Sequence, residues 1–362
     1  MLNASWGSPN LFQVGGAQAA PDLKAAADFL GNGAIEINKY QSEIVDIVRR
    51  ESLFLQRVKQ VPATGQPHRY FEETAIASAQ FVSITNGAAL GTPTASGPLR
   101  FERTVFVKAL SAQTNLQLFD VDVTRQQGQF AYVEAKDIAD ITKAITRLRA
   151  FGIWNGSDTS LTTPSTNQYM GLLAQINQTS TIAIGASIVD GLKAQVAYMA
   201  ANTDFVVRPT GIAINPVLGD LIDREAKAND IKLGEVIVGG VSVQALSTQA
   251  GVLPLIPEPF LPATTSASSN QFGFTPAPAG HSNYFAAIIT EDMIEMPYVH
   301  GGDGNPNPRI FQLGLVGGLQ GQYVGVMFDS VVAKGVTGAT VPSGAYTPAN
   351  TSYPHSIVCV VR

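Results

Sequence analysis

Charged residues are scarce in this sequence. Among 362 residues, 23 Lys and Arg and 28 Asp and Glu make 14% charged residues, while 45% of the residues are hydrophobic. An ordinary soluble domain has about 25% charged residues. A protein with so few strongly hydrated groups either hides much of its surface in subunit contacts or tends to aggregate. The composition therefore predicts extensive self-association.

An excess of basic residues is also lacking, since the net charge is −5 and the isoelectric point is near 5.4. A protein that reads nucleic acid needs clustered Lys and Arg to neutralise phosphates. The charge balance therefore argues against a sequence-specific DNA-binding protein. It remains compatible with a protein that merely encloses DNA.

Cysteine is nearly absent, since Cys359 is the only one. One cysteine excludes an intramolecular disulfide and a CxxC redox pair. The long uncharged stretches are too rich in polar residues to cross a membrane, which takes about 20 mainly apolar residues. The start, MLNASWGSPN, has neither the basic nor the apolar region of a secretory signal. We therefore expect synthesis in the cytosol and no membrane partner.

Motifs of nucleotide-binding and hydrolytic enzymes are missing. The sequence has no G-x-x-x-x-G-K-[ST] phosphate loop, no G-x-G-x-x-G fingerprint and no G-x-S-x-G nucleophile elbow. The run HGGDG, from His300 to Gly304, resembles an oxyanion loop. Without a recognisable nucleophile, the run favours a flexible turn. We therefore predict no catalytic residues and no cofactor.

A metal site is not indicated either. No H-E-x-x-H pair occurs, and the four histidines lie in separate segments. Asp303–Asn307 begins like an EF-hand loop, but Pro308 and Gly314 stand where that loop requires Gly and Glu. A turn is the better interpretation of this segment. The histidines are His68, His281, His300 and His355.

The first sixty residues predict an arm followed by a helix. Residues up to about Gly33 are rich in Gly, Ala, Asn and Pro, which favours an extended arm. From Glu36 to Lys59, apolar residues recur at roughly helical spacing, which predicts one or two helices that stop before Pro62. The whole chain exceeds the roughly 250–300 residues that one core usually serves. Two compact units are therefore expected.

A long hairpin is predicted from Val61 to Leu110. Its ends, HRYFEE and RFERTVFVKAL, have the pattern of strands, and its middle, Thr74–Leu99, carries no charge. An isolated two-stranded ribbon is marginally stable in water. We therefore expect the hairpin to pack on another subunit, with a flexible loop as the alternative.

Both charge signs gather at the base of this hairpin. They belong either to solvated surface pairs worth about 0–1 kcal/mol each, or to contacts in register with opposite charges on a neighbouring subunit. The sequence leaves both interpretations open. The candidate inter-subunit residues are Arg69, Glu72, Glu73, Arg100 and Arg103.

A long helix is predicted from Gln126 to Phe151, with Gly152 placed to end it. Its expected buried stripe contains six apolar residues, which makes it a structural spine rather than a cofactor seat. These residues are Phe130, Val133, Ile138, Ile141, Ile145 and Leu148.

After the polar loop that follows this helix, alternating helix and strand signals predict an α+β unit. Ser187 and Asp190 form a capping box, and Asn215-Pro216 is an N-cap followed by proline at the first helical position, with a helix to about Asn229. A hairpin is expected around Gly239-Gly240. The prolines of VLPLIPEPFLP favour an extended or edge path, and residues 263–280 favour a surface loop. The strands YFAAII, RIFQLGLVGG, QYVGVMFDSVVAKG and SIVCVV follow, the last returning to an earlier sheet.

This order of elements resembles the major capsid proteins of tailed phages, which have the Hong Kong 97 fold. The resemblance lies in the arm, a helix ending in SLFLQRVKQVP, the long hairpin, and a spine helix running into FGIWNGSDT and then NQYMGLL. The segments TGIAINP, VSVQAL before VLPLIPEPF, and QYVGVMFDSVVAKG resemble strands of the axial and peripheral domains of that fold.

The resemblance implies an α+β capsid subunit with an arm and helix at 1–60, an extension loop at 61–110 and a peripheral domain with the spine helix at 111–202. It further implies an axial domain at 203–327, with excursions back to the peripheral domain, and C-terminal strands at 328–362 that return to the peripheral domain. Such subunits form pentamers and hexamers of an icosahedral shell around packaged double-stranded DNA. The implied location is the virion, assembled in the cytoplasm of a bacterial host. The implied partners are other copies of this chain, a portal protein and, as in some members of the family, a decoration protein.

Two departures from the family qualify this expectation. Some members cross-link their shells from an extension-loop lysine, whereas here no lysine lies between Lys59 and Lys108, so we expect no such cross-link. Some members begin with a cleaved scaffolding domain, whereas here Met1 almost directly opens the arm, so we expect a separate scaffolding protein. The alternatives are an encapsulin-type nanocompartment shell, another phage structural protein and, least favoured, an enzyme.

Overall fold

A computed structural model describes residues 52–75, 97–119, 133–176, 178–201, 208–265, 274–300, 304–316, 320–335 and 354–362, with positions 77, 79, 122 and 126. The chain divides into two units. Met1–Ile47 with Phe119–Val133 forms one unit, and Val48–Leu118 with Glu134–Arg362 forms the other. The predicted arm and most of the predicted hairpin tip lie outside the described residues. The architecture below is that of the larger unit.

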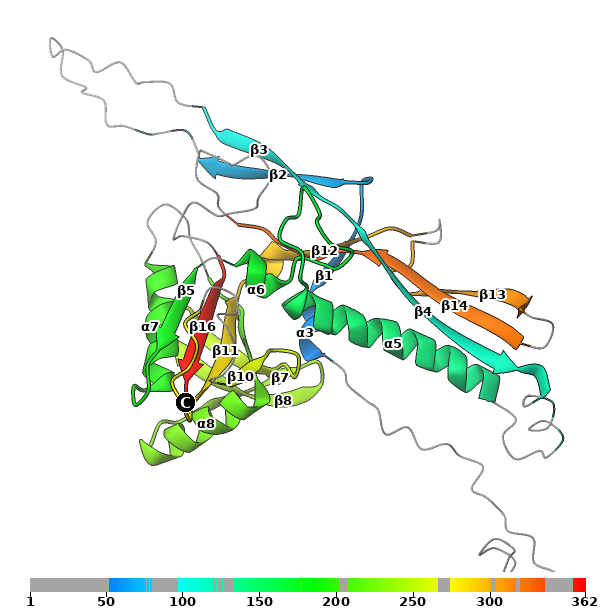
Figure 1. The fold of residues 1–362 in the computed structure, drawn as a ribbon. Coiled ribbons are helices and arrows are strands. Elements are labelled where there is room, and N and C mark those ends of the chain that lie inside the picture. The colour runs from blue at the N-terminus through cyan, green and yellow to red at the C-terminus, as the bar shows by residue number, and fades with distance from the viewer. Residues whose placement is uncertain are drawn as a thin grey trace, which may run out of the picture. The chain divides into compact units, whose positions relative to one another are not determined.

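The first sheet has six strands, and helix α5 covers one of its faces (Figure 1). Strand β14 pairs antiparallel with β13 on one side and with β4 on the other, and it touches β12 at its end. Gly325 of β14 gives α5 close access, because a Cβ atom there would come within 2.4 Å of Ile141. The strands are β1 (Lys59–Pro62), β4 (Lys108–Gln117), β12 (Ile294–Tyr298), β13 (Arg309–Val316), β14 (Gln320–Asp329) and β15 (Val332–Ala333).

Helix α5 is described from Val133 to Asn155, so the predicted stop at Gly152 is wrong. Gly152 lies inside the helix, and the position leaves little room for a side chain, because a Cβ atom there would come within 2.8 Å of the Tyr169 ring. Leu148, which was expected on the buried stripe, is 50% exposed. The buried position one turn after Ile145 belongs to Arg149, whose side chain pairs with a buried carboxylate.

The second sheet has eight strands and is covered on both faces. Alternate residues of its central strands belong to two different cores, as the two-residue period of a strand requires. The last strand pairs with two earlier ones, which confirms the predicted return of the C-terminus. The strands are β5 (Thr179–Ile182), β6 (Gly211–Ile214), β7 (Gly234–Val238), β8 (Val241–Thr248), β9 (Gly251–Pro257), β10 (Ala263–Thr265), β11 (Ser282–Ile289) and β16 (Ser356–Val361).

Strand β9 is an interior strand and not an edge strand, although it contains Pro254. It runs between β6 and β8. Its pairing with β6 covers Leu255 to Pro257, so Pro254 lies outside that ladder. The expected surface loop at 263–280 is interrupted by the short strand β10, and it buries Phe274.

Local signals placed the helices that cover the second sheet. The Ser187 hydroxyl accepts a hydrogen bond from the Asp190 N–H at 3.1 Å, which confirms the predicted cap of α7 (Ile188–Ala200). The Asn215 side chain accepts from the Val217 N–H at 2.9 Å and caps α8 (Pro216–Ala228). Both helices bury apolar residues in one core of the sheet. The short helices are α3 (Leu53–Arg57), α6 (Leu172–Gln175) and the 3₁₀ turn η1 (Glu291–Met293).

The hairpin forms a two-stranded sheet of its own, from β2 (His68–Ala75) and β3 (Leu99–Val105). The segment RFERTVFVKAL is not one strand as expected. It divides at Phe106 and Val107, and Lys108 begins β4 in the first sheet. Val105 and Leu110 are both buried in the same core. In one continuous strand, residues five positions apart would point to opposite faces. The break between β3 and β4 lets both side chains reach that core.

Candidate subunit-contact surfaces

The five candidate residues all lie on the β2–β3 ribbon, on two different faces. Residues two apart in a strand share a face. Arg69, Phe71 and Glu73 therefore form an outer face with Arg100, which is opposite Glu73. The inner face carries Glu72 and Arg103, whose side chains are only 7% and 8% exposed.

Each candidate residue has an opposite charge within its own chain. On the outer face, Arg100 Nε lies 2.7 Å from Glu73, and Arg69 Nη1 lies 3.1 Å from Glu102. On the inner face, Arg103 Nε donates to Glu72 Oε2 at 2.9 Å. The structure thus brings the five together. Whether any of them contacts a neighbouring copy stays a prediction.

The inner face is fixed to the rest of the chain. The second oxygen of Glu72 accepts from the Gly335 N–H at 3.3 Å. The ammonium of Lys334 lies 5.2 Å from the centre of the Tyr70 ring and 2.7 Å from Glu295. Glu72 and Arg103 therefore anchor the ribbon, and the outer face is the one that another subunit could reach.

Sequence reasoning missed the most exposed group of the outer face, the Phe71 ring, which is 73% exposed. Strand alternation could have found it, because Phe71 lies between the inward-facing Tyr70 and Glu72. A large exposed aromatic ring among charged residues is the kind of group that is enriched in protein interfaces.

The first sheet presents a second surface on the face opposite α5. Because Gly325 faces α5, its neighbours Val324 and Val326 project from the other face. Phe311 of β13 lies directly across from Val324 and is 47% exposed. The Arg309 guanidinium lies 6.0 Å from the centre of the Phe311 ring and 5.7 Å from that of Phe328. We call these five residues the open face.

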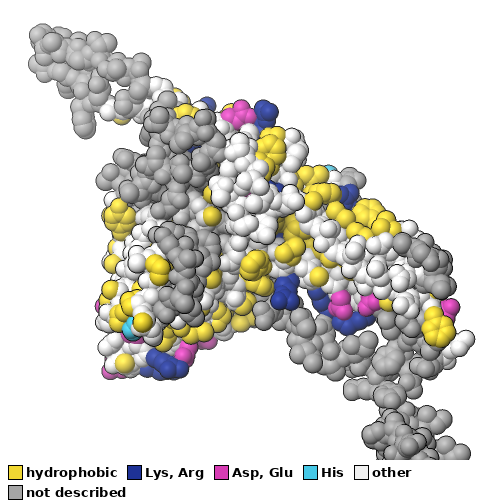
Figure 2. Space-filling view, viewed as in Figure 1, with side chains coloured by type: hydrophobic (Ala, Val, Ile, Leu, Met, Phe, Trp, Pro, Cys, Tyr) yellow, Lys and Arg dark blue, Asp and Glu magenta, His cyan; other side chains and the backbone are white. Residues whose placement is uncertain are grey.

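Uncharged side chains dominate the surface between these regions. In Figure 2, charged side chains gather on the hairpin, along α5 and near α8, and hydrophobic or uncharged ones cover much of the described surface between them. The low charge of the sequence is therefore visible as broad weakly polar areas.

Buried ion pairs hold the first sheet, α5 and the polar loop together. Arg149 Nε lies 2.6 Å from Asp329 Oδ2, and the Tyr169 hydroxyl donates to Asp329 Oδ1. Burial, together with the Asp329 carboxylate, holds the pKa of Tyr169 well above its usual value.

A further buried ion pair lies nearby, where Lys108 Nζ is 2.6 Å from Asp158. Burial opposes ionisation of Asp158, but hydrogen bonds from Lys108 and Ser165 outweigh it and lower the pKa of this carboxyl.

A second buried carboxyl joins α3 to the loop after β9. Glu258 is fully buried, and its Oε2 accepts from the Ser52 hydroxyl at 2.5 Å. Its Oε1 accepts from the Phe260 N–H at 3.3 Å. Burial raises the pKa of Glu258 to about 7, against the opposing effect of these bonds. Ser52 also caps α3, so one hydroxyl couples the helix start to the carboxyl.

The described residues include no cluster of the kind that holds a metal ion. In that part of the chain, no group of three or more His, Cys, Asp or Glu side chains could hold a metal. His355 is fully buried, its Nδ1 accepts from the Thr290 N–H, and burial lowers its pKa to about 4. Gly301–Asp303 of the HGGDG run lies outside the described residues. The described helices also include none that is both long and apolar enough to cross a membrane.

No protein-family model matches the sequence, and no curated protein does. Solved structures do match. The head of Helicobacter pylori bacteriophage KHP40 aligns with a TM-score of 0.62 at 9% identity, covering 92% of this chain and 96% of the other. The capsid of a native GTA particle aligns with a TM-score of 0.57 at 10% identity, covering 91% and 97%. The chain has the Hong Kong 97 capsid fold.

This fold confirms the α+β class and the resemblance to tailed-phage capsid proteins that the sequence indicated. The Hong Kong 97 fold is shared by a protein of another kind. The encapsulin SrpI of Synechococcus elongatus PCC 7942 aligns with a TM-score of 0.52 at 14% identity, covering 92% of this chain and 94% of the other. At such low identity the match establishes the fold, and the function has to be argued separately.

Proposed function

We propose that this chain is the major capsid protein of a tailed bacteriophage. It assembles as pentamers and hexamers into an icosahedral shell that encloses double-stranded DNA. The observation that carries the proposal is a capsid fold matched over about nine-tenths of the chain, combined with a charged fraction of only 14%. Its role is structural, with no catalytic step.

The proposal assigns a role to each surface. The extension loop, 61–110, lies across a neighbouring subunit, and the outer face of the β2–β3 ribbon supplies its contacts. Arg69, Glu73 and Arg100 select the geometry of that contact rather than providing much affinity. The open face of the first sheet packs against another copy. For the peripheral domain, 111–202, and the axial domain, 203–327, we keep the boundaries that the family resemblance implies.

The proposed partners follow from the same role. They are other copies of this chain, a separate scaffolding protein, a portal protein and, in some particles, a decoration protein. The acidic balance, a net charge of −5, suits a wall that encloses DNA without binding it tightly. The location is the virion, after assembly in the bacterial cytoplasm.

Electron microscopy of the purified full chain, with and without its scaffolding protein, tests the proposal. We expect closed icosahedral shells, or pentamers and hexamers that close when scaffold is added. A denaturing gel should show single subunits without covalent ladders, because no lysine lies between Lys59 and Lys108. A compact monomer under all conditions would refute the proposal.

An encapsulin-type shell is the second candidate, favoured by the match to SrpI. The two candidates differ in what the particle contains. Particles isolated from the producing cells should hold nuclease-protected double-stranded DNA of one length if the chain is a phage capsid protein. Particles that hold a cargo protein and no such DNA would establish the encapsulin alternative.

A further inference from the structure

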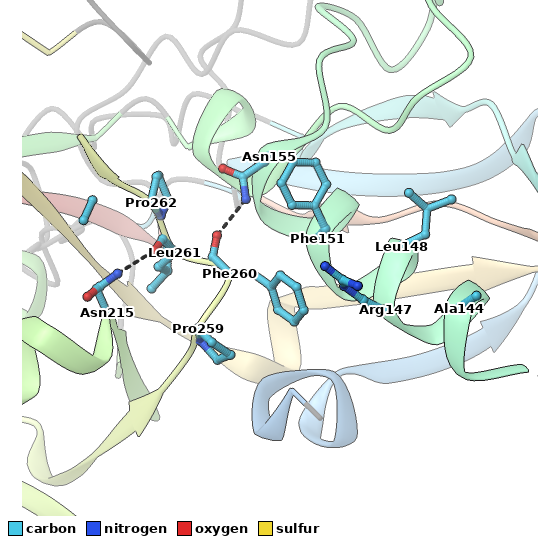
Figure 3. A pocket seen from close by; sticks show the side chains of 11 residues that line it. Ala144, Arg147, Leu148, Phe151, Asn155, Asn215, Pro259, Phe260, Leu261 and Pro262 are labelled. Atoms are coloured by element: carbon cyan, nitrogen blue, oxygen red, sulfur yellow. Dashed lines mark hydrogen bonds between the residues drawn. The ribbon is translucent and has the colours of Figure 1, made fainter. Parts of the chain in front are cut away.

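Helix α5 carries a second, mainly apolar stripe that the described residues leave partly uncovered. The stripe consists of Ala144, Leu148 and Phe151 with the polar Asn155 at its end, spaced by four, three and four residues, so these side chains lie along one face of the helix. Leu148 is 50% and Phe151 is 45% exposed. Figure 3 shows these two side chains along one side of a groove.

The loop after β9 forms the other side of the groove, through Pro259, Phe260 and Pro262 (Figure 3). Two asparagines hold this loop by its carbonyl groups. Asn155 donates to the Phe260 carbonyl and Asn215 to the Leu261 carbonyl, each at 2.7 Å. The loop is further tied to α3 through Glu258, which accepts from the Phe260 N–H. The groove is therefore preformed.

The groove has a volume of about 670 Å³, enough for several side chains of a ligand. Among the described residues that line it, Arg147 is the only charged one. An occupant that complements this lining presents apolar side chains and one carboxylate. We propose that the groove binds an amphipathic helix of a second protein, with an apolar ridge on Leu148 and Phe151 and an acidic side chain facing Arg147.

The spacing of the stripe favours a helix as the occupant. Residues four and three apart form the ridges and grooves through which two helices pack, and amphipathic helices use such anchors in apolar grooves. The small side chain of Ala144 permits close approach at one end. The stripe from Ala144 to Asn155 spans about 16 Å at 1.5 Å per residue, which is three helical turns.

The described helices of a second copy fit the groove poorly. Helices α7 and α8 bury their apolar faces in their own core and expose only Tyr198 and Val217 as large apolar side chains. Pairing α5 with α5 of another copy would bring two Arg147 side chains near one shared groove. An acidic amphipathic helix of a different protein would have an accessible apolar face and would not bring a second arginine to the groove. This inference goes beyond the proposed function and does not depend on it.

Fluorescence polarisation with two synthetic helical peptides tests the proposal on the full-length chain. The acidic probe is an alanine-based peptide with leucines four and three residues apart and glutamates beside that stripe. In the basic probe, lysines replace the glutamates. We expect the wild-type chain to bind the acidic probe about tenfold more tightly than the basic one, and Arg147→Glu to reverse this preference. Arg147 is exposed, so this variant should fold.

Leu148→Lys should abolish binding of the acidic probe. Val217→Lys is the matched control, because Val217 is 51% exposed and lies on α8 outside the groove. Circular dichroism and the unfolding midpoint check that each variant is folded. Equal affinity of the two probes, or unchanged binding by a folded Leu148→Lys variant, would overturn the proposal. The proposal would also be overturned if the wild-type chain binds neither probe and Leu148→Lys loses self-association. The groove would then be a contact between copies.

Discussion

The two sheets of this protein are covered differently. In the second sheet, Phe285 and Ala286 are adjacent residues of β11 that point to opposite faces, and both are fully buried. In the first sheet, Gly325 is buried against α5, while Phe311 on the open face is 47% exposed. The second sheet is thus covered on both faces within the chain, whereas the described residues leave the open face of the first sheet partly exposed. Under the proposed function, another copy of the chain covers this open face.

The largest predicted effect is a difference in stability between two substitutions, one of a phenylalanine in the second sheet and one of a phenylalanine in the first. Phe285→Ala should lower the free energy of unfolding by about 3–5 kcal/mol, because it empties a buried site. Phe311→Ala should change it by less than about 1 kcal/mol but reduce the yield of closed shells. Denaturant unfolding and electron microscopy measure the two effects. A large loss of stability in Phe311→Ala would show that the open face is already part of a core.

A smaller effect separates buried from exposed ion pairs. Arg149→Met removes the cation that pairs with the buried Asp329 carboxylate. Breaking a buried ion pair lowers the free energy of unfolding by about 3–5 kcal/mol at most. Arg100→Met removes an exposed pair with Glu73, worth about 0–1 kcal/mol. Denaturant unfolding at pH 7 compares them. Equal effects would contradict the role of Asp329 as a buried junction.

The pH dependence of the free energy of unfolding measures the contribution of the buried Glu258 carboxyl. Its folded pKa is about 7 and its ordinary value is 4.5, so the folded state binds more protons between these pH values. The contribution of Glu258 to stability is therefore fully present below pH 4.5 and is lost as the pH rises through 7.

Glu258→Gln keeps a hydrogen-bond acceptor but does not titrate. Relative to the wild-type chain it should be more stable at pH 8, by about 2–4 kcal/mol, and the difference should shrink towards pH 4. Thermal or denaturant unfolding across this range measures the difference. The buried His355 titrates in both proteins and cancels in the comparison. A difference that does not vary with pH would contradict the raised pKa.

The smallest effect on the subunit comes from exchanging the charges of one outer-face pair. Combining Glu73→Arg with Arg100→Glu keeps the pair within the ribbon but reverses the charges that a neighbour meets. The free energy of unfolding should change by less than about 0.5 kcal/mol, while the yield of shells should fall. Unchanged assembly would favour the alternative that these residues are ordinary solvated surface.

Features set by a few neighbouring residues were predictable from the sequence. The caps at Ser187 and Asn215 and the turn at Gly239-Gly240 each depend on contacts within a few positions, and the structure has all three. The segments YFAAII, QYVGVMFDSVVAKG and SIVCVV were also predicted as strands, and the structure has β11, β14 and β16 there.

Features set by distant contacts were not predictable. Gly152 lies within α5 and does not end it, and it stands where the distant Tyr169 ring leaves little room for a side chain. Leu148 is exposed because Arg149 takes the buried position to meet Asp329, which is far away in the sequence. The sequence likewise indicated the charges of the hairpin but not that Glu72 and Arg103 face inward, since this depends on which face of the ribbon meets Gly335.

Hydrogen–deuterium exchange of dissociated subunits and of assembled particles tests the central claim most directly. The account predicts that assembly slows exchange in β13, β14 and the β2–β3 ribbon, while β11 and β16 exchange equally slowly in both states. Particles in which β13, β14 and the ribbon gain no protection would contradict the claim that neighbouring copies complete the first sheet.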